Sequence, residues 1–405
     1  MKILIHSDEY APTAQACSYR MQVFADTFIL EGDEVTVVTS SANKANGEID
    51  RTKHKEKIIY SPAIRMKKKT TVMRMLNNIS FGITSIFFAI SAGDVDVVIT
   101  TSPPPLVSIS GWIIAKYKGA KLVYDVRDIW PDVALEMGSF AEDSFFCKVF
   151  EAIADFMYKH ADIVTTVSPR KVEKIKRHIA AYGADKAGFE HIDKVWLIGN
   201  GFDENAAKSE LDLDIIDKYG LDIKPTCVYI GNIGLAQGLG ALLDVAAKTK
   251  HKDIQFLCFG MGAEREILEK RANDEGLKNV KFCDVIEHSK VFSILSKAKL
   301  SFISLKSNKM RDSVPTKVYE ALGIGCPVLL VAEGDSSDIV DESGFGIHIS
   351  PDESDKLVEA FDDMIDRYSE LGTHREGAIR LMHEKYSRQR IAKEFNKKLH
   401  RLCGK

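Results

Sequence analysis

The chain has 405 residues, which is enough for two domains of about 200 residues each. Its composition, 45% hydrophobic and 28% charged, is typical of a soluble globular protein, and a formal net charge of −3 gives no overall basis for nucleic-acid binding. The seven cysteines form no CxxC pair, and several, such as Cys227 and Cys258, stand in apolar runs, so we expect buried thiols in a reducing compartment. No signal peptide precedes the first apolar run and no stretch has the roughly 18–20 apolar residues of a membrane span, so we expect a cytosolic protein.

Strand-like apolar runs alternate with amphipathic helical runs along the chain. This alternation predicts a doubly wound α/β architecture with parallel sheets. In the first half the expected strands are residues 2–7, 34–40, 56–62, 95–102, 120–126 and 162–168. Helical patterns such as 18–32 and 106–119 lie between them. Because ligands bind at the carboxyl ends of parallel strands, the residues that directly follow these runs are the first candidates for a functional site.

Residues 64–91 combine a basic run with an apolar stretch. The basic side chains are Lys67, Lys68, Lys69 and Arg74, and the large apolar ones are Phe81, Ile83, Ile86, Phe87 and Phe88. This composition favours a helix that lies on an anionic membrane surface. A solvated basic loop that leads into a core helix fits the same pattern, so both interpretations stay open.

Two loops that follow strands of the first half are candidates for a site. Residues 100–106, TTSPPPL, form a proline-rich loop that suits either a rigid pocket wall or a simple turn. Residues 124–132, YDVRDIWPD, place Asp125, Arg127 and Asp128 behind a buried strand. Buried charges are costly unless they are paired or functional. The second loop is therefore either part of a functional site or an internal salt-bridge network that fixes its own conformation.

Residues 194–207 predict a strand that runs into a Gly/Asn turn and a polar linker, after which the alternation restarts. The expected elements of the second half are strands at 226–232, 254–260, 280–285, 299–304, 326–332 and 345–350 and helices at 356–371 and 388–403. Glycine-bearing turns at 229–240 and 258–267 follow two of these strands, and such turns let a ligand approach the backbone amides. Gly260-Met261-Gly262 is only a partial dinucleotide fingerprint.

The segment 310–335, MRDSVPTKVYEALGIGCPVLLVAEGD, carries two carboxylates, Asp312 and Glu320, around a predicted helix. Pro315 indicates the helix start and Gly323 or Gly325 its end. The helix N-terminus has free amides that suit a phosphate, and Lys317 adds a cation there. Glu320 would then lie one sugar ring from that phosphate and accept from ribose hydroxyls. An ordinary amphipathic helix with a solvated Glu is the alternative.

We expect no metal site. Asp94-Val95-Asp96 is an Asp-x-Asp motif, but it precedes its strand, at the wrong edge of the sheet for a substrate, and we interpret it as a solvated turn. Neither a Ser-His-Asp arrangement nor a pair of histidines at helical spacing stands out in the sequence.

Taken together, these motifs resemble the retaining, nucleotide-sugar-dependent glycosyltransferases of the GT-B fold, in the large family whose signature is a Glu-x7-Glu motif. The order TSPPP, YDVRDIWPD, GNIGLAQGL, GMGAEREILE and VPTKVYEALGIGCPV is similar to the bacterial polysaccharide branch that includes L-fucosamine (N-acetylfucosamine) transferases. The resemblance covers nearly the whole chain. It implies two Rossmann-like doubly wound domains that face each other across a cleft: residues 1–195 on the acceptor side, residues 196–385 for the nucleotide-sugar donor, and a C-terminal helix at 386–405 that packs back toward the N-terminal domain.

The resemblance also implies roles for residues of the donor site. Glu320 would bind the ribose hydroxyls, and Asp312, where the family has a longer Glu, would contact the donor sugar. Within residues 283–286, CDVI, the backbone of Val285 and Ile286 would cradle the base. The glycine turns at Gly231 and Gly260 would complete the site.

The Arg and Lys that neutralise the diphosphate in the family are replaced here by Asn232 and Gln237. Lys317, Arg311 and Arg127 are the candidate cations, and Lys317 ranks first because of its helix N-terminus. Asp125 stands where many members have a His near the anomeric carbon. It would orient or assist the acceptor hydroxyl.

The implied activity moves a sugar, such as an N-acetylated amino sugar, from a nucleoside diphosphate donor, expected to be UDP-linked, to a lipid-linked saccharide of a bacterial surface polysaccharide such as O-antigen or capsule. We expect a metal-independent, front-face reaction without a cofactor, on the inner face of the cytoplasmic membrane, with residues 64–91 as the membrane contact. Nucleic acid is not an expected partner. The alternative is a catalytically silent GT-B scaffold that binds a partner glycosyltransferase, because the usual Arg/Lys pair is missing. A nicotinamide-dependent oxidoreductase is disfavoured by the incomplete fingerprint.

Overall fold

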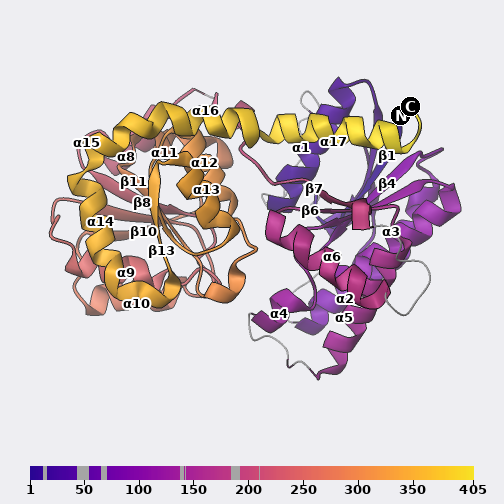
Figure 1. The fold of residues 1–405 in the computed structure, drawn as a ribbon, viewed down its shortest axis with the longest axis horizontal. Coiled ribbons are helices and arrows are strands. Elements are labelled where there is room, and N and C mark those ends of the chain that lie inside the picture. Colours follow the sequence, from indigo (N-terminus) through magenta and orange to yellow (C-terminus); the bar gives the residue numbers. More distant parts are fainter. Residues whose placement is uncertain are drawn as a thin grey trace. The chain divides into compact units, whose positions relative to one another are not determined.

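The computed structural model describes residues 1–11, 16–42, 54–64, 71–136, 141, 143–183, 192–208 and 210–405. It divides into two compact α/β units (Figure 1). Unit 1 consists of Met1–Asn200 and Gln389–Lys405, and unit 2 consists of Gly201–Arg388. The predicted boundary between residues 195 and 196 runs through a strand of unit 1, and the division instead falls after Asn200.

Within its described residues, unit 1 has a parallel sheet of seven strands in the order β3-β2-β1-β4-β5-β6-β7. The strands are β1 (Lys2–His6), β2 (Glu34–Ser40), β3 (Lys57–Ser61), β4 (Val97–Ser102), β5 (Lys121–Val126), β6 (Ile163–Thr166) and β7 (Val195–Leu197). The strands form where the sequence has near-continuous apolar runs, as in β1, whose last four residues are all buried. The strand order changes direction between β1 and β4, so the crevice at their carboxyl ends is the expected place for a ligand.

Helices cover both faces of the unit 1 sheet. They are α1 (Ala16–Leu30), α2 (Thr71–Ile90), α3 (Pro105–Lys118), α4 (Asp132–Glu136), α5 (Phe145–His160), α6 (Pro169–Gly183), the short η2 (Ile192–Lys194) and the C-terminal α17 (Arg388–Leu402). On one face α17 packs beside α1, where the Phe395 ring lies 5.3 Å from Phe24 and 5.9 Å from Phe28 (Figure 1). The C-terminal helix therefore completes the core of the first unit, because the two helices together cover that face of the sheet.

The described residues of unit 2 form a second parallel sheet, of six strands, in the order β10-β9-β8-β11-β12-β13. Its strands are β8 (Thr226–Ile230), β9 (Gln255–Phe259), β10 (Val280–Cys283), β11 (Leu300–Ser304), β12 (Val328–Val331) and β13 (Gly346–Ile349). The order reverses between β8 and β11. The doubly wound parallel architecture expected from the sequence is thus confirmed in both units.

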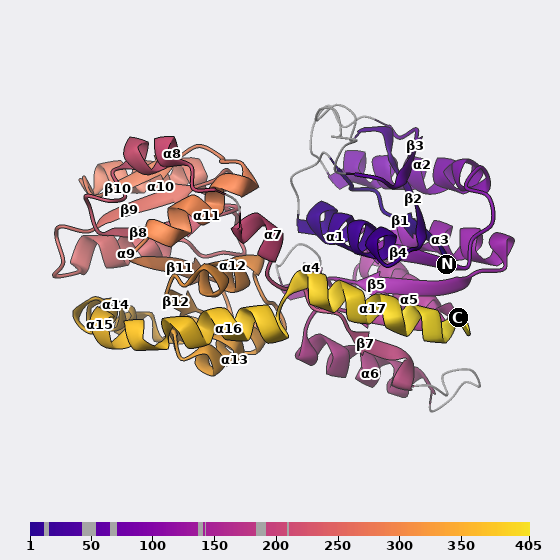
Figure 2. The same ribbon diagram turned by 90° about the horizontal axis from the view of Figure 1, so that it is seen from above.

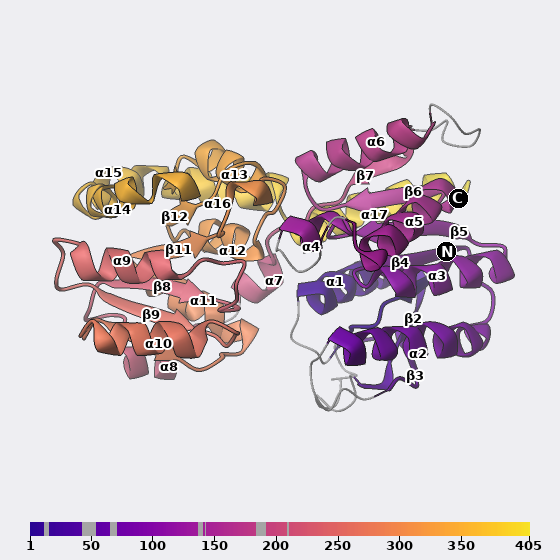
Figure 3. The same ribbon diagram turned by 90° about the horizontal axis from the view of Figure 1, so that it is seen from below.

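The helices of unit 2 lie on both faces of its sheet (Figure 3). They are α7 (Glu204–Ala207), α8 (Leu213–Tyr219), α9 (Gly240–Lys248), α10 (Arg265–Asp274), α11 (His288–Lys297), α12 (Thr316–Ile324), α13 (Asp335–Ser343), α14 (Leu357–Asp366), α15 (Tyr368–Leu371) and α16 (Arg375–Lys385), with short 3₁₀ turns η3 (Asn308–Met310), η4 (Pro351–Lys356) and η5 (Gly372–His374). The single helix expected at 356–371 is broken at Arg367, whose φ of −96° and ψ of 20° leave the helical region.

Helix α12 has the limits that its sequence predicts. Pro315 is the residue before its first turn, and Gly325 ends it in the left-handed conformation with a φ of +78°. The backbone N–H of Gly325 donates to the carbonyl of Leu322, and that of Cys326 donates to the carbonyl of Ala321. Glycine is favoured at position 325 because a side chain would be strained at this φ. The helix therefore starts directly behind the loop that follows β11.

Candidate active site

Two glycine turns lie next to each other at the carboxyl edge of the unit 2 sheet. Gly231 follows β8 and Gly260 follows β9, with φ angles of +143° and +142°. A Cβ on Gly260 would lie 1.9 Å from the carbonyl oxygen of Gly231. Any residue other than glycine would therefore clash with that oxygen. The turns therefore pack backbone against backbone, and neither carries a side chain over the end of its strand.

Lys317, in the first turn of α12, reaches this edge. Its Nζ lies 4.0 Å above the ring of Tyr229, a β8 residue, and 3.1 Å from the place where a Cβ on Gly231 would be. Burial lowers the pKa of Lys317 to about 8, although the nearby Glu320 acts in the opposite direction. The structure thus brings Lys317 and Gly231 together, and it places a cation beside a bare backbone turn and a helix N-terminus, a combination suited to phosphate oxygens.

Glu320 lies one turn further along α12 and pairs with His288, the first residue of α11. Its Oε1 is 3.1 Å from Nε2 of His288, and 12% of the Glu320 side chain is exposed. Burial alone would raise the pKa of Glu320, but the hydrogen bond with His288 and the charges of His288, Arg388 and Lys317 outweigh it and lower that pKa. The carboxylate is therefore held ionised at neutral pH, and in this form both of its oxygens can only accept hydrogen bonds, as contacts with hydroxyl donors require.

His288 was not among the residues predicted from the sequence. It stands two residues after the CDVI segment, in the loop and helix start that follow β10. Its position in the segment that follows β10 was the one sequence signal that could have indicated a functional role. Its partner Glu320 is 32 residues away, and only the packing of α11 against α12 brings them together (Figure 3).

Asp312 and Arg311 lie in the loop between η3 and α12. Asp312 is partly buried. Arg311 is exposed and donates from Nη1 to Oε2 of Glu333 at 2.6 Å, while its carbonyl oxygen accepts from the N–H of Asp335 at 2.8 Å. The guanidinium of Arg311 is therefore engaged with a carboxylate, whereas the amine of Lys317 rests on an aromatic ring. This difference favours Lys317 as the diphosphate cation.

The remaining predicted donor residues lie in neighbouring loops of the same edge. Nδ2 of Asn232 donates to Oε1 of Gln237 at 3.4 Å, so the two residues at the positions where the sequence resemblance expects cations contact each other. The loop after β10 contains Val285, 65% exposed, and Ile286, which packs partly on the core. An exposed apolar side chain at a strand end suits the flat face of a nucleobase.

At the carboxyl edge of the unit 1 sheet, the buried carboxylate is paired within the protein. Asp125, on β5, is fully buried and accepts from Arg20 at 2.9 Å on Oδ1 and 3.3 Å on Oδ2, and from the Thr165 hydroxyl at 2.7 Å. Arg20 also donates to the carbonyls of Ile198 and Gly199 at 2.7 and 2.8 Å. Such a network corresponds to the salt-bridge alternative that the sequence left open. The acceptor role of Asp125 stays a prediction, and the geometry gives it a structural role.

Arg127 follows β5 at the carboxyl edge of unit 1, near Asp8, which follows β1. Nη2 of Arg127 donates to the carbonyl of Pro103 at 2.8 Å, and its buried Nε has no hydrogen-bond partner among the described residues. Burial and the neighbouring Glu9 raise the pKa of Asp8 to about 7, against the charge of Arg127. Asp8, which sequence reasoning missed, therefore joins Arg127 as a titratable group at this strand edge.

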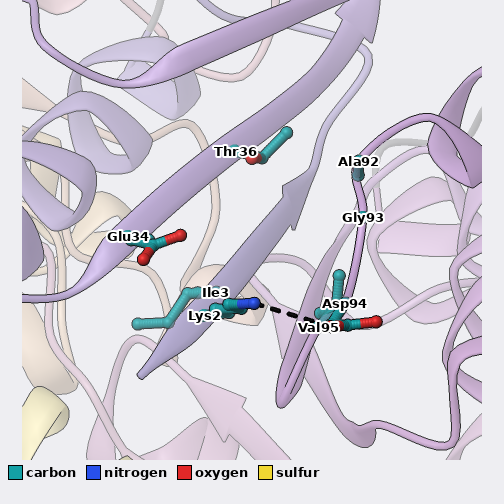
Figure 4. A pocket seen from close by; sticks show the side chains of 8 residues that line it. All are labelled: Lys2, Ile3, Glu34, Thr36, Ala92, Gly93, Asp94 and Val95. Carbon is teal, nitrogen blue, oxygen red and sulfur yellow. Dashed lines mark ion pairs between the residues drawn. The ribbon is translucent and has the colours of Figure 1, made fainter.

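A hollow of about 90 Å³ lies at the opposite, amino edge of the unit 1 sheet (Figure 4). Lys2, Glu34 and Asp94 are among its lining residues, and Nζ of Lys2 lies 3.6 Å from Asp94 (Figure 4). Asp96 accepts from the N–H of Lys2 and from the Lys405 amine, both at 2.7 Å. The Asp-x-Asp motif therefore stabilises the strand beginnings, and Asp96 is bonded rather than simply solvated.

Helix α2 lies against β2 and β3 and beside α3 (Figure 2). Its Ser85 hydroxyl is 2.9 Å from Nε2 of the buried His6, and Phe81, which is fully buried, stacks on the His6 ring. Phe81 therefore belongs to the core and cannot contact a membrane, contrary to the sequence-based expectation. Lys67, Lys68 and Lys69 lie outside the described residues.

The opposite face of α2 is apolar and exposed. It carries Leu76, Ile79, Ile83, Phe87 and Ile90, which we call the α2 stripe and which are 42–67% exposed. Their spacing of three or four residues places them on one side of the helix. Among the described residues α2 is also the one helix that is long and apolar enough, by length and composition, to cross a membrane, over Met73–Ile90, of which 28% is buried. This differs from the expectation that the chain has no stretch of that kind.

Comparison with known proteins identifies the fold. Residues 214–379 match the family described as glycosyl transferases group 1. WcaI of Escherichia coli (strain K12), named as a colanic acid biosynthesis glycosyl transferase, is 24% identical over 355 residues, 82% of this chain and 84% of that protein. The structure of sucrose-phosphate synthase from Thermosynechococcus elongatus has a TM-score of 0.79 at 16% identity, covering 100% of this chain and 99% of that one. Anabaena HepE, in complex with UDP and glucose, has a TM-score of 0.75 at 16% identity, covering 99% and 100%. The chain therefore has the GT-B fold, and residues 214–379, within unit 2, are similar to the glycosyl transferases group 1 family.

Proposed function

We propose that the protein is a retaining glycosyltransferase that moves a sugar from a nucleoside diphosphate donor to a lipid-linked saccharide in bacterial surface polysaccharide synthesis. The family match, the relative named for colanic acid biosynthesis and the structural neighbour with bound UDP and glucose support this assignment. The same neighbour makes UDP the first donor nucleotide to test. An N-acetylated amino sugar is the first candidate for the transferred group, on the sequence resemblance.

The observation that carries the proposal is the grouping of Lys317, Glu320 and Gly231 at the carboxyl edge of unit 2. A ribose contacts the ionised Glu320, and the diphosphate lies against the Gly231 turn and the first turn of α12, where Lys317 supplies the positive charge. These groups sit where the strand order reverses, between β8 and β11. A partly desolvated lysine beside an ionised carboxylate at a strand end favours a ligand site over a scaffold.

The reaction uses the same groups. The bond between the anomeric carbon and the diphosphate oxygen breaks, a bond from the acceptor oxygen to the anomeric carbon forms on the same face, and the acceptor proton passes to the leaving phosphate. Negative charge grows on the diphosphate as that bond breaks. The Lys317 ammonium and the α12 amides stabilise this charge, and they require no metal ion to do so.

The test is an activity assay of the purified full chain with a panel of nucleotide sugars, with and without excess chelator. We expect slow release of UDP from one UDP-sugar, at a rate that chelator does not change. Glu320→Gln should weaken binding of the nucleotide sugar. Glu342→Gln, which changes a glutamate on α13, is the matched control and should keep the wild-type rate. If no nucleotide sugar is bound or hydrolysed by the wild type, the scaffold alternative replaces the proposal.

We further propose that the α2 stripe rests on the cytoplasmic membrane, where a lipid-linked acceptor would be found. The stripe supplies the apolar contact, and Arg74, which is exposed, adds a positive charge at the N-terminal end of α2. The test is sedimentation with anionic vesicles at low and high salt. Ile83→Ser with Phe87→Ser should release the protein from the vesicles, and Leu213→Ser, an equally exposed leucine of unit 2, should not. A wild type that stays in the supernatant at low salt would refute the membrane contact.

A further inference from the structure

Three metal-ligating side chains converge in unit 1, away from the groups assigned to the donor. They are Asp26 on α1 and His54 and Glu56 in the segment that leads into β3. One ligand atom from each lies within 4.8 Å of the other two. Nδ1 of His54 is 3.8 Å from an oxygen of Asp26 and 3.8 Å from an oxygen of Glu56.

These separations are too long for hydrogen bonds, yet Nδ1 of His54 is buried and has no hydrogen-bond partner among the described residues. Two metal–ligand bonds of about 2.1 Å span at most about 4.2 Å, so a cation between the three atoms would reach all of them with small side-chain adjustments. The imidazole nitrogen thus points toward two carboxylates at a spacing that a bridging ion fits and a direct bond does not.

The surroundings of Glu56 resemble the support of a ligand. Its side chain is fully buried, and its Oε1 accepts from the hydroxyl of the fully buried Tyr10 at 2.8 Å. Metal-binding carboxylates are commonly oriented by such outer hydrogen bonds. The Asp26 side chain is 40% exposed, which leaves a path for an ion from solvent.

We propose that Asp26, His54 and Glu56 bind a divalent transition-metal ion, with Zn²⁺ as the first candidate. One imidazole and two carboxylates form a donor set that suits Zn²⁺ better than Mg²⁺, which prefers oxygen ligands and water. A solvent molecule completes the coordination. The ion links α1 to the segment that enters β3, the edge strand of the sheet, and its role is structural. It takes no part in the proposed reaction, whose donor groups belong to unit 2.

The experiment titrates ZnCl₂, with MgCl₂ for comparison, into the chelator-stripped full chain by calorimetry and follows the unfolding temperature. We expect one Zn²⁺ per chain and a rise of a few degrees in the unfolding temperature, since an ion that binds only the folded state stabilises it. His54→Ala and Glu56→Gln should each weaken this binding at least tenfold. Tyr10→Phe should weaken it by about tenfold, because outer-shell bonds tune metal affinity.

The matched control is His348→Ala, because His348 pairs with a single carboxylate, Asp341, at 2.9 Å. This variant should bind Zn²⁺ like the wild type. Zn²⁺ binding that survives in both His54→Ala and Glu56→Gln would place the ion elsewhere and overturn the proposal. Absence of binding to the wild type would also overturn it and leave the cluster as a histidine–carboxylate ion pair. The rate of sugar transfer is a separate readout. Measured at low temperature, where the protein stays folded without the ion, this rate should not change when chelator is added.

Discussion

The carboxyl edges of the two sheets carry similar charges and use them differently. In unit 1, Asp125 is fully buried and both of its oxygens are bonded to Arg20. In unit 2, Glu320 pairs with His288, and the Lys317 ammonium rests on a tyrosine ring. A charge whose bonds are completed within the protein holds the fold, and a charge that keeps bonding capacity at a strand end is available to a ligand. Position behind a buried strand does not by itself distinguish the two cases.

The largest effect should come from Asp125→Asn. This change leaves the guanidinium of Arg20, 2% exposed, without its carboxylate, and breaking one partner of a buried pair costs about 3–5 kcal/mol. We expect a loss of this size in the free energy of unfolding by denaturant, with UDP affinity of the folded protein unchanged. Asp162→Asn is the control, since the Asp162–Lys121 pair is partly exposed and should be worth about 1 kcal/mol or less. Wild-type stability together with lost sugar transfer would instead make Asp125 a reacting group.

Glu320→Gln should come next, with a loss of about 1.5–3 kcal/mol in the binding of UDP, because charge-assisted bonds to the ribose are replaced by neutral ones. The fold should persist. Calorimetry with UDP and 2′-deoxy-UDP checks the assignment: the wild type should prefer UDP, and the variant should lose most of that preference. Equal preference in both proteins would remove Glu320 from the ribose site.

The pH dependence of binding should reveal Lys317, whose pKa of about 8 in the free protein is set by burial. Below that pH the amine is charged and attracts the diphosphate. As pH rises through about 8 the free protein loses this charge, so UDP affinity should fall between pH 7.5 and 9.5. Lys317→Arg should flatten the profile, because a guanidinium stays charged over this range. An unchanged slope in that variant would assign the titration to another group.

The smallest effect should be that of His288→Ala, which removes the partner that orients Glu320 at 3.1 Å. We expect about 1 kcal/mol less binding free energy for UDP, with kcat affected less than KM. His288→Gln should recover part of the loss, since an amide N–H can donate to the carboxylate. His251→Ala, which breaks a pair with Asp366, is the control in the same unit. A loss in kcat alone would contradict a positioning role.

The local sequence pattern was enough to predict the strands and helices and to place the α12 residues of the proposed donor site. Apolar periodicity gave the strands, and Pro315 and Gly325 gave the limits of α12, so Lys317 and Glu320 could be placed on one helix from sequence. The partner of Glu320 could not, because α11 and α12 meet through tertiary packing. The same holds for Asp125, whose partner Arg20 is 105 residues away.

The α2 segment shows the boundary between the two kinds of information. Composition favoured an apolar helix on a membrane surface, with a core helix as the open alternative, and it grouped Phe81 with Ile83 and Phe87. Which side is buried depends on His6 and Ser85, which fix the helix on the sheet and cover Phe81. The sequence by itself determined the α/β alternation, the glycine turns and the helix start at Pro315, because those follow from periodicity and backbone conformation within a few residues. Only the tertiary structure decided which charged side chains are paired within the protein and which can still bind a ligand. The physical reason is that burial and ion pairing join residues that are far apart in the chain.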